Sequence, residues 1–173
     1  MRCDEPWWRS HSAIRTPAPV RAKAMGMTVA ASDPFVHAAD PAWSGIERHR
    51  RLVDLLAAAD VVSLHVPLTA KTRGMIDMAA LAAMRPGAIL INTSRGGIVD
   101  EAALAAALRS GRLGGAALDV FAREPLGAEA AGPFADCPNL ILTPHVAGLT
   151  EESNVRVSLV TARTLREVLL TSG

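Results

Sequence analysis

One stretch, residues 88–119, constrains the fold of this chain more than any other part of the sequence. It begins with a short apolar run, continues through a turn with two glycines and an alanine-rich amphipathic segment, and ends with a second apolar run. Two buried parallel strands joined by a right-handed crossover helix give this pattern. Asp100 stands where a helix favours an N-cap. The sequence therefore predicts a βαβ unit with strands at 88–92 and 114–120 and a helix at 100–110.

The composition favours an α/β fold with one core. Half of the 173 residues are apolar and only 3% are aromatic. Small aliphatic side chains suit the space between a parallel sheet and its helices, and a chain of this length can bury one good core. We therefore expect a Rossmann-like parallel sheet with flanking helices. Apolar periodicity adds a helix ending at Gly26, strands at 27–32, 61–66 and 139–143, and helices at 52–59, 77–84 and 151–170.

Two segments between these elements are expected to be connections. Residues 35–51 are polar, and residues 121–138 contain Pro125, Pro133 and Pro138. Proline has no backbone N–H to donate, so it interrupts regular structure. The basic residues at 48–51 are expected to form the exposed start of a helix.

Charge and cysteine content exclude several kinds of partner. Lys and Arg number 18 against 17 Asp and Glu, and no basic stripe is long enough to follow a nucleic acid backbone. Cys3 and Cys137 fit no metal-ligand or CxxC spacing, so we expect free thiols and no metal site. No apolar run approaches the ~18 residues of a membrane span, and the first residues lack the core of a signal peptide. The sequence predicts a cytoplasmic protein that binds neither nucleic acid nor membrane.

Polar side chains follow three successive predicted strands, namely Arg95, Glu124 and His145. Parallel strands end at one edge of a sheet, so we expect these side chains to share a cleft. A guanidinium can hold the carboxylate of a 2-keto acid, and imidazole can exchange a proton near neutral pH beside a carboxylate that stabilises the protonated ring. The set suits interconversion of 2-hydroxy and 2-keto acids. Taken singly, the residues also have structural explanations: a surface arginine, a loop carboxylate and a histidine satisfied by backbone carbonyls.

Asp33 has two interpretations. An acidic residue at the end of the second strand of a Rossmann fold accepts hydrogen bonds from the ribose of NAD and repels the extra phosphate of NADP. Aspartate before a proline is also a common turn former, and Pro34 follows here. Both interpretations stay open from the residue alone.

Four long motifs identify a family resemblance. They are LHVPLTAKTRGMID (64–77), MRPGAILINTSRGGIVDEAALAAAL (84–108), GRLGGAALDVFAREPL (111–126) and PNLILTPHVAGLTEE (138–152). In this order they closely resemble the NAD-binding domain of the D-isomer-specific 2-hydroxyacid dehydrogenases, which include phosphoglycerate dehydrogenase, glyoxylate/hydroxypyruvate reductase and formate dehydrogenase. The resemblance covers about residues 20–170.

The resemblance implies an activity and a set of site residues. The activity is reversible hydride transfer between NAD(H) and a D-2-hydroxy or 2-keto acid. Arg95 is implied to bind the substrate, His145 to be the acid/base and Glu124 to be its partner. Homodimers are common in the family. The residues implied to surround the cofactor are Asp33, Val66, Thr93, Asp119, His145 and Gly148.

The sequence departs from the family at the phosphate-binding turn. A GxGxxG turn is expected ~20 residues before the ribose carboxylate. The first glycine of the chain is Gly26, and the segment SHSAIRTPAPVRAK contains prolines instead. The strand that precedes this turn is also expected to be missing. Since that strand lies in the middle of the 3-2-1-4-5-6 order, its absence leaves the strands at 27–32 and 61–66 without a neighbour.

A second departure concerns the substrate-binding domain, which precedes the nucleotide domain in the family. No counterpart is present here, so the apolar face of the helix at 151–170 is expected to lie exposed or to pair with another chain. We expect an N-terminally truncated copy whose first residues are read from another frame. Translating the upstream nucleotides in all frames tests this, because finding no GxGxxG strand–turn–helix would contradict it.

These observations predict three regions and two alternative functions. Residues 1–19 form an irregular segment because Pro6, Pro17 and Pro19 interrupt helices, residues 20–150 form an incomplete NAD-binding domain, and residues 151–173 form a C-terminal helix. The first function is an NAD-dependent D-2-hydroxyacid dehydrogenase. The alternative is a catalytically impaired remnant that acts only as a dimerising or partner-binding module. A third possibility is that a separate polypeptide supplies the missing domain and first strand, which co-purification would show.

Overall fold

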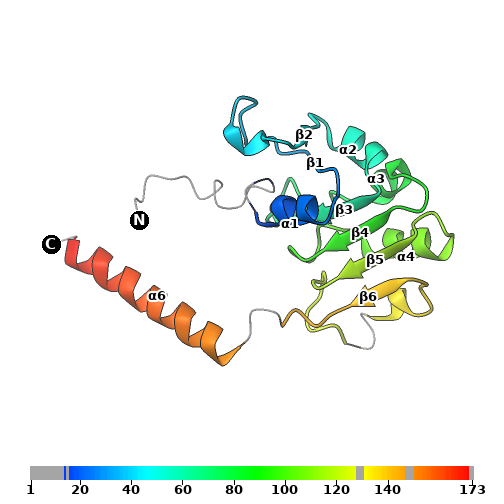
Figure 1. Cartoon of the computed structure of the whole chain (residues 1–173). Helices are drawn as coiled ribbons and strands as arrows, with labels where there is room; N and C mark the ends of the chain where they lie inside the picture. Colours follow the sequence, from blue (N-terminus) through cyan, green and yellow to red (C-terminus); the bar gives the residue numbers. More distant parts are fainter. Residues whose placement is uncertain (1–13, 15, 128–130, 147–149, 172–173) are drawn as a thin grey trace.

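The main sheet has four parallel strands. The computed structural model describes residues 14, 16–127, 131–146 and 150–171 (Figure 1). The strand order is β3-β4-β5-β6, and every neighbouring pair is parallel. This confirms the Rossmann-like parallel sheet that the sequence predicts. The strands are β3 (Val61–Leu64), β4 (Ile89–Asn92), β5 (Gly115–Leu118) and β6 (Leu140–Leu142).

A smaller sheet lies apart from the main sheet. It consists of β1 (Ala30–Ala31) and β2 (Glu47–Arg48), which pair in parallel. Among the described residues no strand joins the two sheets. The break falls where sequence analysis expects the first strand to be missing, between the counterparts of the strands at 27–32 and 61–66.

The helices begin and end near their predicted positions. The carboxylate of Asp100 caps α4 by accepting a hydrogen bond from the backbone N–H of Ala103 at 3.0 Å, which confirms the βαβ unit β4–α4–β5. Asp77 caps α3 in the same way through Ala80 at 2.8 Å. The helices are α1 (Ala18–Ala24), α2 (Leu52–Ala58), α3 (Met78–Ala83), α4 (Glu101–Arg109) and α6 (Glu151–Thr171), with 3₁₀ turns η3 (Pro41–Trp43) and η4 (Gly132–Phe134).

The core lies between one face of the main sheet and the helices α2, α3 and α4. Alternate strand residues such as Leu64 and Leu90 are buried there against Leu56, Leu81 and Leu104. Burying each of these side chains contributes roughly 1.5–3 kcal/mol. The opposite face of the sheet is more open, and its exposed side chains include those of Val61, Ser63, Ile89 and Ile141.

Helix α1 begins at Ala18 with Pro17 as its N-cap, close to the expected end of the irregular segment, because proline fits the first turn of a helix. Two predictions about residues 35–51 are wrong. The segment 35–51 contains η3 and β2 and is more than a connection. Arg48 lies in β2 and not at a helix start, and its guanidinium stacks over the Trp43 ring at 5.2 Å. A cation–π contact between distant residues leaves no alternating apolar pattern in the sequence, so the strand could not be predicted from it.

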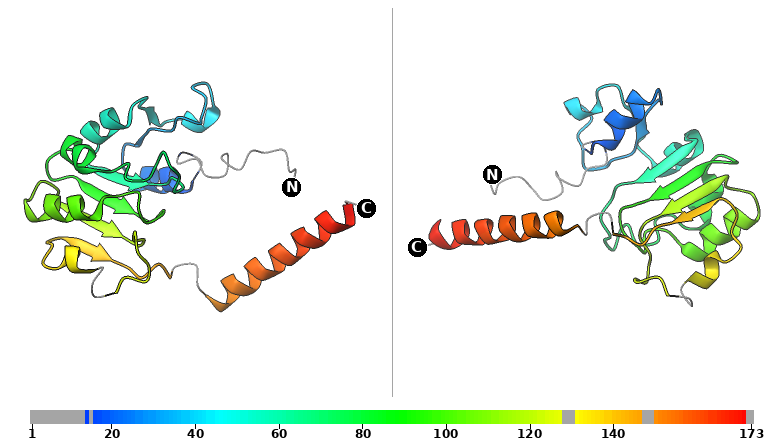
Figure 2. Two further views of the ribbon diagram at one scale, coloured as in Figure 1. Left: turned by 180° about the vertical axis from the view of Figure 1, so that it is seen from behind. Right: turned by 60° about the horizontal axis from the view of Figure 1, so that its bottom comes forward.

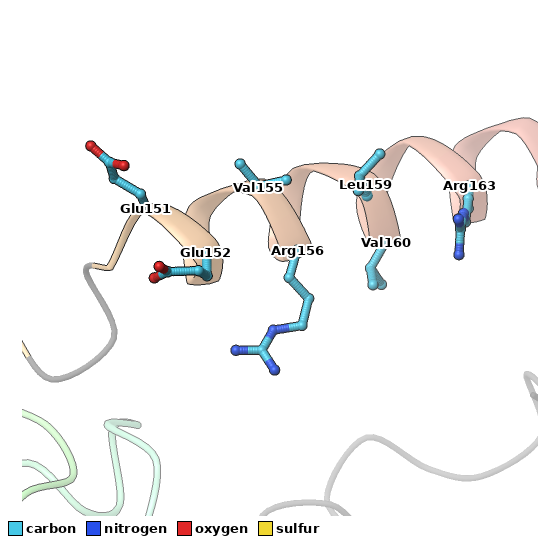
Figure 3. A pocket seen from close by; sticks show the side chains of 7 residues that line it. All are labelled: Glu151, Glu152, Val155, Arg156, Leu159, Val160 and Arg163. Carbon is cyan, nitrogen blue, oxygen red and sulfur yellow. The ribbon is translucent and has the colours of Figure 1, made fainter.

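The C-terminal helix α6 extends away from both sheets in every view (Figures 1 and 2). The apolar side chains described on its first turns are exposed, including Val155 at 59% and Leu159 at 51%. The shallow hollow in Figure 3 is lined by residues of α6 alone and therefore encloses no site. In the described ranges no helix combines the length and the apolar character needed to cross a membrane.

Candidate functional site

Three polar residues lie beyond the carboxyl ends of neighbouring parallel strands. Arg95 follows β4, Glu124 follows β5, and His145 follows β6. Because β4 pairs with β5 and β5 with β6, all in parallel, the three residues lie at one edge of the sheet. Ligand sites of open α/β sheets lie at this edge.

His145 and Glu124 form the best-defined contact of the site. The Nδ1 atom of His145 lies 3.0 Å from Oε2 of Glu124, with the two side chains 43% and 38% exposed. The other carboxylate oxygen, Oε1, accepts a hydrogen bond from the backbone N–H of Phe121 at 2.9 Å. An ionised carboxylate only accepts, so Nδ1–H donates to it. This arrangement leaves Nε2 of His145 available to a substrate.

The hydrogen bond with His145, followed by that with the Phe121 backbone, lowers the pKa of Glu124 below its ordinary value of 4.5. A lowered pKa means that the ionised carboxylate and its contacts persist as the pH falls through 4.5 and are lost only below the folded-state pKa. We expect the carboxyl carbon of Glu124, followed by NMR, to titrate below the range of exposed glutamates. In His145→Gln the titration midpoint of Glu124 should rise. An unchanged midpoint would show that the His145 ring does not stabilise the ionised carboxylate.

The backbone of His145 is fixed by Asp119. The Oδ1 atom of Asp119 accepts hydrogen bonds from the N–H of His145 at 3.1 Å and from the Thr143 hydroxyl at 2.5 Å. His145 has a φ of 55°, which is uncommon for a residue with a side chain. Asp119 thus stabilises the strained turn that carries the imidazole.

The turn that carries Arg95 is organised by Asn92, which is only 1% exposed. Its Oδ1 accepts hydrogen bonds from the N–H and the hydroxyl of Ser94 at 3.1 and 2.8 Å, and its Nδ2 donates to the carbonyl of Arg95 at 3.0 Å. The exposed guanidinium of Arg95 donates to the Ser94 carbonyl at 2.6 Å. A buried polar side chain therefore determines the path of the turn.

Asn92→Ala is expected to lower the free energy of unfolding by about 1–3 kcal/mol, because it removes these bonds and leaves buried polar groups without partners. Thermal or urea unfolding measures the loss. Ser94→Ala is the matched control, since it removes only the hydroxyl bond to Asn92 and should have a smaller effect. Equal stability of Asn92→Ala and the unmodified chain would contradict the role of Asn92.

Gly96 allows the Arg95 turn to pack against the loop that leads to Glu124. A Cβ atom at Gly96 would lie 1.7 Å from the carbonyl oxygen of Phe121 and 2.8 Å from the backbone nitrogen of Ala122. No side chain fits there. The two loops that carry Arg95 and Glu124 are thus in direct backbone contact.

Several residues that sequence analysis implies for the cofactor lie at the same edge. Val66 follows β3 and is half-buried, while Thr93 follows β4 and is exposed. Asp119 follows β5 and is half-buried. Gly148 lies outside the described residues. In the described part of the chain no cluster of three metal-ligating side chains occurs.

Asp33 follows β1 and is only 7% exposed. Its Oδ1 accepts a hydrogen bond from the N–H of Phe35 at 3.0 Å, which is the turn interpretation of this residue. A carboxylate can accept several hydrogen bonds, so the turn and ribose interpretations do not exclude each other. The residues present thus fit the ribose and nicotinamide ends of a dinucleotide, while no glycine-rich turn precedes β1 in the described chain.

Sequence analysis did not single out two polar residues at this edge. Asn92 could have been found as the one polar residue in an otherwise apolar strand. His65 follows β3, where the Ser63 hydroxyl lies 3.0 Å from its Nε2, and burial lowers the pKa of its ring. The available signal was a histidine inside the apolar run predicted as a strand at 61–66.

Comparisons with known proteins find similar proteins over most of this chain. The family described as D-isomer specific 2-hydroxyacid dehydrogenase, NAD binding domain, matches residues 13–147. The (S)-sulfolactate dehydrogenase of Chromohalobacter salexigens is 56% identical over 149 residues, which are 86% of this chain and 48% of that protein. The D-3-phosphoglycerate dehydrogenase of Synechocystis is 46% identical over 152 residues, 86% of this chain and 26% of that protein. The chain thus spans about half or less of the length of these relatives.

A solved structure shows the same fold. The D-lactate dehydrogenase of Aquifex aeolicus, complexed with NAD and lactic acid, superimposes with a TM-score of 0.76 at 32% identity, covering 88% of this chain and 49% of that chain. The matched family and this structural likeness extend over most of the chain. The chain therefore belongs to the D-isomer specific 2-hydroxyacid dehydrogenases and matches their NAD-binding domain.

Proposed function

We propose that this chain provides the catalytic edge of an NAD-dependent dehydrogenase that interconverts D-2-hydroxy acids and 2-keto acids. The observation that carries the proposal is the imidazole of His145, held through Nδ1 by the carboxylate of Glu124 at the sheet edge that also carries Arg95. An oriented imidazole with a free Nε2 is suited to proton transfer near neutral pH.

Each of the three residues has one role in the proposed reduction. The guanidinium of Arg95 binds the carboxylate of the keto acid and orients its carbonyl group. His145 donates a proton from Nε2 to the carbonyl oxygen as it becomes a hydroxyl, and Glu124 stabilises the protonated ring before that transfer. NADH, when bound, would supply the hydride that C2 of the keto acid accepts. In the oxidation direction, the neutral imidazole accepts the hydroxyl proton.

The cofactor is proposed to extend along the carboxyl edge of the sheets. Asp33 would accept a hydrogen bond from the adenosine ribose, which favours NAD over NADP. Val66 and Thr93 would line the site of the nicotinamide. Asp119 would contribute by stabilising the turn that carries His145. Gly148 is proposed as the point where the chain passes close to the cofactor.

The test measures NADH oxidation by the purified full chain with glyoxylate and hydroxypyruvate. We expect absorbance of NADH to fall with either keto acid, and to stay constant with hydroxyacetone, which has a ketone but no carboxylate for Arg95. Equal rates with hydroxyacetone would contradict the role of Arg95. No oxidation with any 2-keto acid would contradict the proposed activity of this chain.

Several finer properties belong to the same proposal. The substrate is a small 2-hydroxy acid, and (S)-sulfolactate, D-3-phosphoglycerate and D-lactate form a suitable panel because dehydrogenases similar to this chain are named for them or hold lactic acid. We also propose a cytoplasmic location and a homodimer, which analytical ultracentrifugation would detect. The division into residues 1–19, 20–150 and 151–173 stays a prediction that limited proteolysis can test.

A further inference from the structure

The outer edge of β3 carries backbone groups that no described strand pairs with. The carbonyl of Asp60 accepts a hydrogen bond from the N–H of Ile89 at 2.9 Å. The backbone groups of Asp60, Val62 and Leu64 therefore point toward β4. Backbone direction alternates along a strand, and therefore the N–H and C=O groups of Val61 and Ser63 point to the opposite edge. The side chains of both residues are exposed.

The smaller sheet has an open edge of the same kind. The carbonyls of Val29 and Ala31 accept hydrogen bonds from β2 and the following residue, at 3.0 and 2.9 Å. Ala30, which lies between them, directs its N–H and C=O away from β2. In all views the β1–β2 pair lies on the β3 side of the main sheet, not on the β6 side (Figures 1 and 2). Two strands with open edges thus lie next to each other, although the described residues show no pairing between them.

We propose that the open edges of β1 and β3 form a docking slot for one extended polypeptide segment, which adds a strand between the two sheets. Unpaired backbone groups in regular spacing are complementary to an extended strand, and adding one is a common way for proteins to bind peptides. A helix satisfies its own backbone groups and offers none to these edges.

The slot also specifies the side chains of the segment. On one face, an added strand lies beside Val62 and Leu64, which are 5% and 4% exposed and pack in the core. On the other face it lies beside Val61, an apolar side chain that is 42% exposed, and beside Ser63, whose hydroxyl lies 3.0 Å from Nε2 of His65. Strands of parallel sheets with this environment are apolar on both faces. The partner is therefore an extended segment of about six residues, rich in valine and isoleucine.

The test uses a fluorescein-labelled synthetic peptide of about six alternating valine and isoleucine residues, with lysines at its ends for solubility. Fluorescence anisotropy with the full chain should show saturable binding. A peptide N-methylated at every residue cannot donate a backbone hydrogen bond to either edge and should not bind. In the chain, Ser63→Pro removes an N–H at the open edge of β3 and should weaken binding by at least about tenfold. Ser63→Ala keeps the N–H and should bind like the unmodified chain.

Amide hydrogen exchange of the unmodified chain gives a second readout that does not depend on the proline variant. The peptide should slow exchange at Val61, Ser63 and Ala30, but not at Leu140 and Leu142, whose backbone groups lie at the far edge on β6. Absence of saturable binding, equal binding to folded Ser63→Pro, or protection confined to β6 would overturn the proposal. Protection of Ala30 and Ser63 without peptide would also overturn it, because β1 and β3 would then already be paired. None of these readouts depends on dehydrogenase activity.

Discussion

His145→Gln is expected to lower the rate of keto-acid reduction by about 10²–10⁴-fold, the contribution typical of a positioned general acid. Glutamine approximates the size and polarity of the ring, but its amide does not act as a general acid or base near neutral pH. The proton for the nascent hydroxyl must then come from water. The measurement is the steady-state oxidation of NADH with glyoxylate, compared with the unmodified chain.

Two controls separate catalysis from folding. Thermal unfolding and NADH fluorescence should change little in His145→Gln, because the side chain is partly exposed and contacts the carboxylate of Glu124. His37→Gln alters an exposed histidine whose ring accepts a hydrogen bond only from the nearby Ala39 N–H among the described contacts, and it should keep full activity. A rate within about twofold of the unmodified chain for His145→Gln would eliminate His145 as the acid/base.

Gly96→Ala is expected to lower the melting temperature by roughly 3–10 °C, from an overpacking cost of about 1–3 kcal/mol. The added methyl group meets the Phe121 carbonyl, a backbone atom that cannot rotate away. The Arg95 turn and the Glu124 loop must therefore separate. We expect keto-acid reduction to fall with stability, since the carboxylate-binding and proton-donating groups are no longer held together.

The control for this change is Gly127→Ala. A Cβ at Gly127 would have no atom within 4 Å, so stability and activity should be unchanged. Calorimetry and the NADH assay on both variants test the expectation. If Gly96→Ala melted at the temperature of Gly127→Ala, the close approach of the two loops would not exist in solution.

The sequence was most informative where local signals and burial agree. The unit β4–α4–β5 was predicted because an aspartate cap, an alanine-rich helix and two apolar runs all favour the same structure. The break between the small and main sheets of the described residues was predicted, because the strand order of a Rossmann fold requires a strand there and no segment of the sequence fits it.

The elements that the sequence did not predict are those that depend on contacts between distant residues. β2 has only two residues, neither of them apolar, and exists because its backbone pairs with β1 and Arg48 stacks on Trp43. β1 spans Ala30–Ala31, although a strand was expected over 27–32. Among the described strands β1 pairs only with β2, which has two residues. Few residues of the expected strand therefore form backbone hydrogen bonds with a neighbouring strand.

The residue types and their order along the chain determined the α/β class, the sites of the helices and the identity of the polar residues after each strand. Only the tertiary structure decided how the site is held together. Glu124 and His145 lie 21 positions apart in sequence but 3.0 Å apart in space, Asp119 fixes the His145 turn, and Gly96 lies against Phe121. Local propensity depends on neighbours in sequence, whereas these contacts depend on which strands pair and how closely their loops approach.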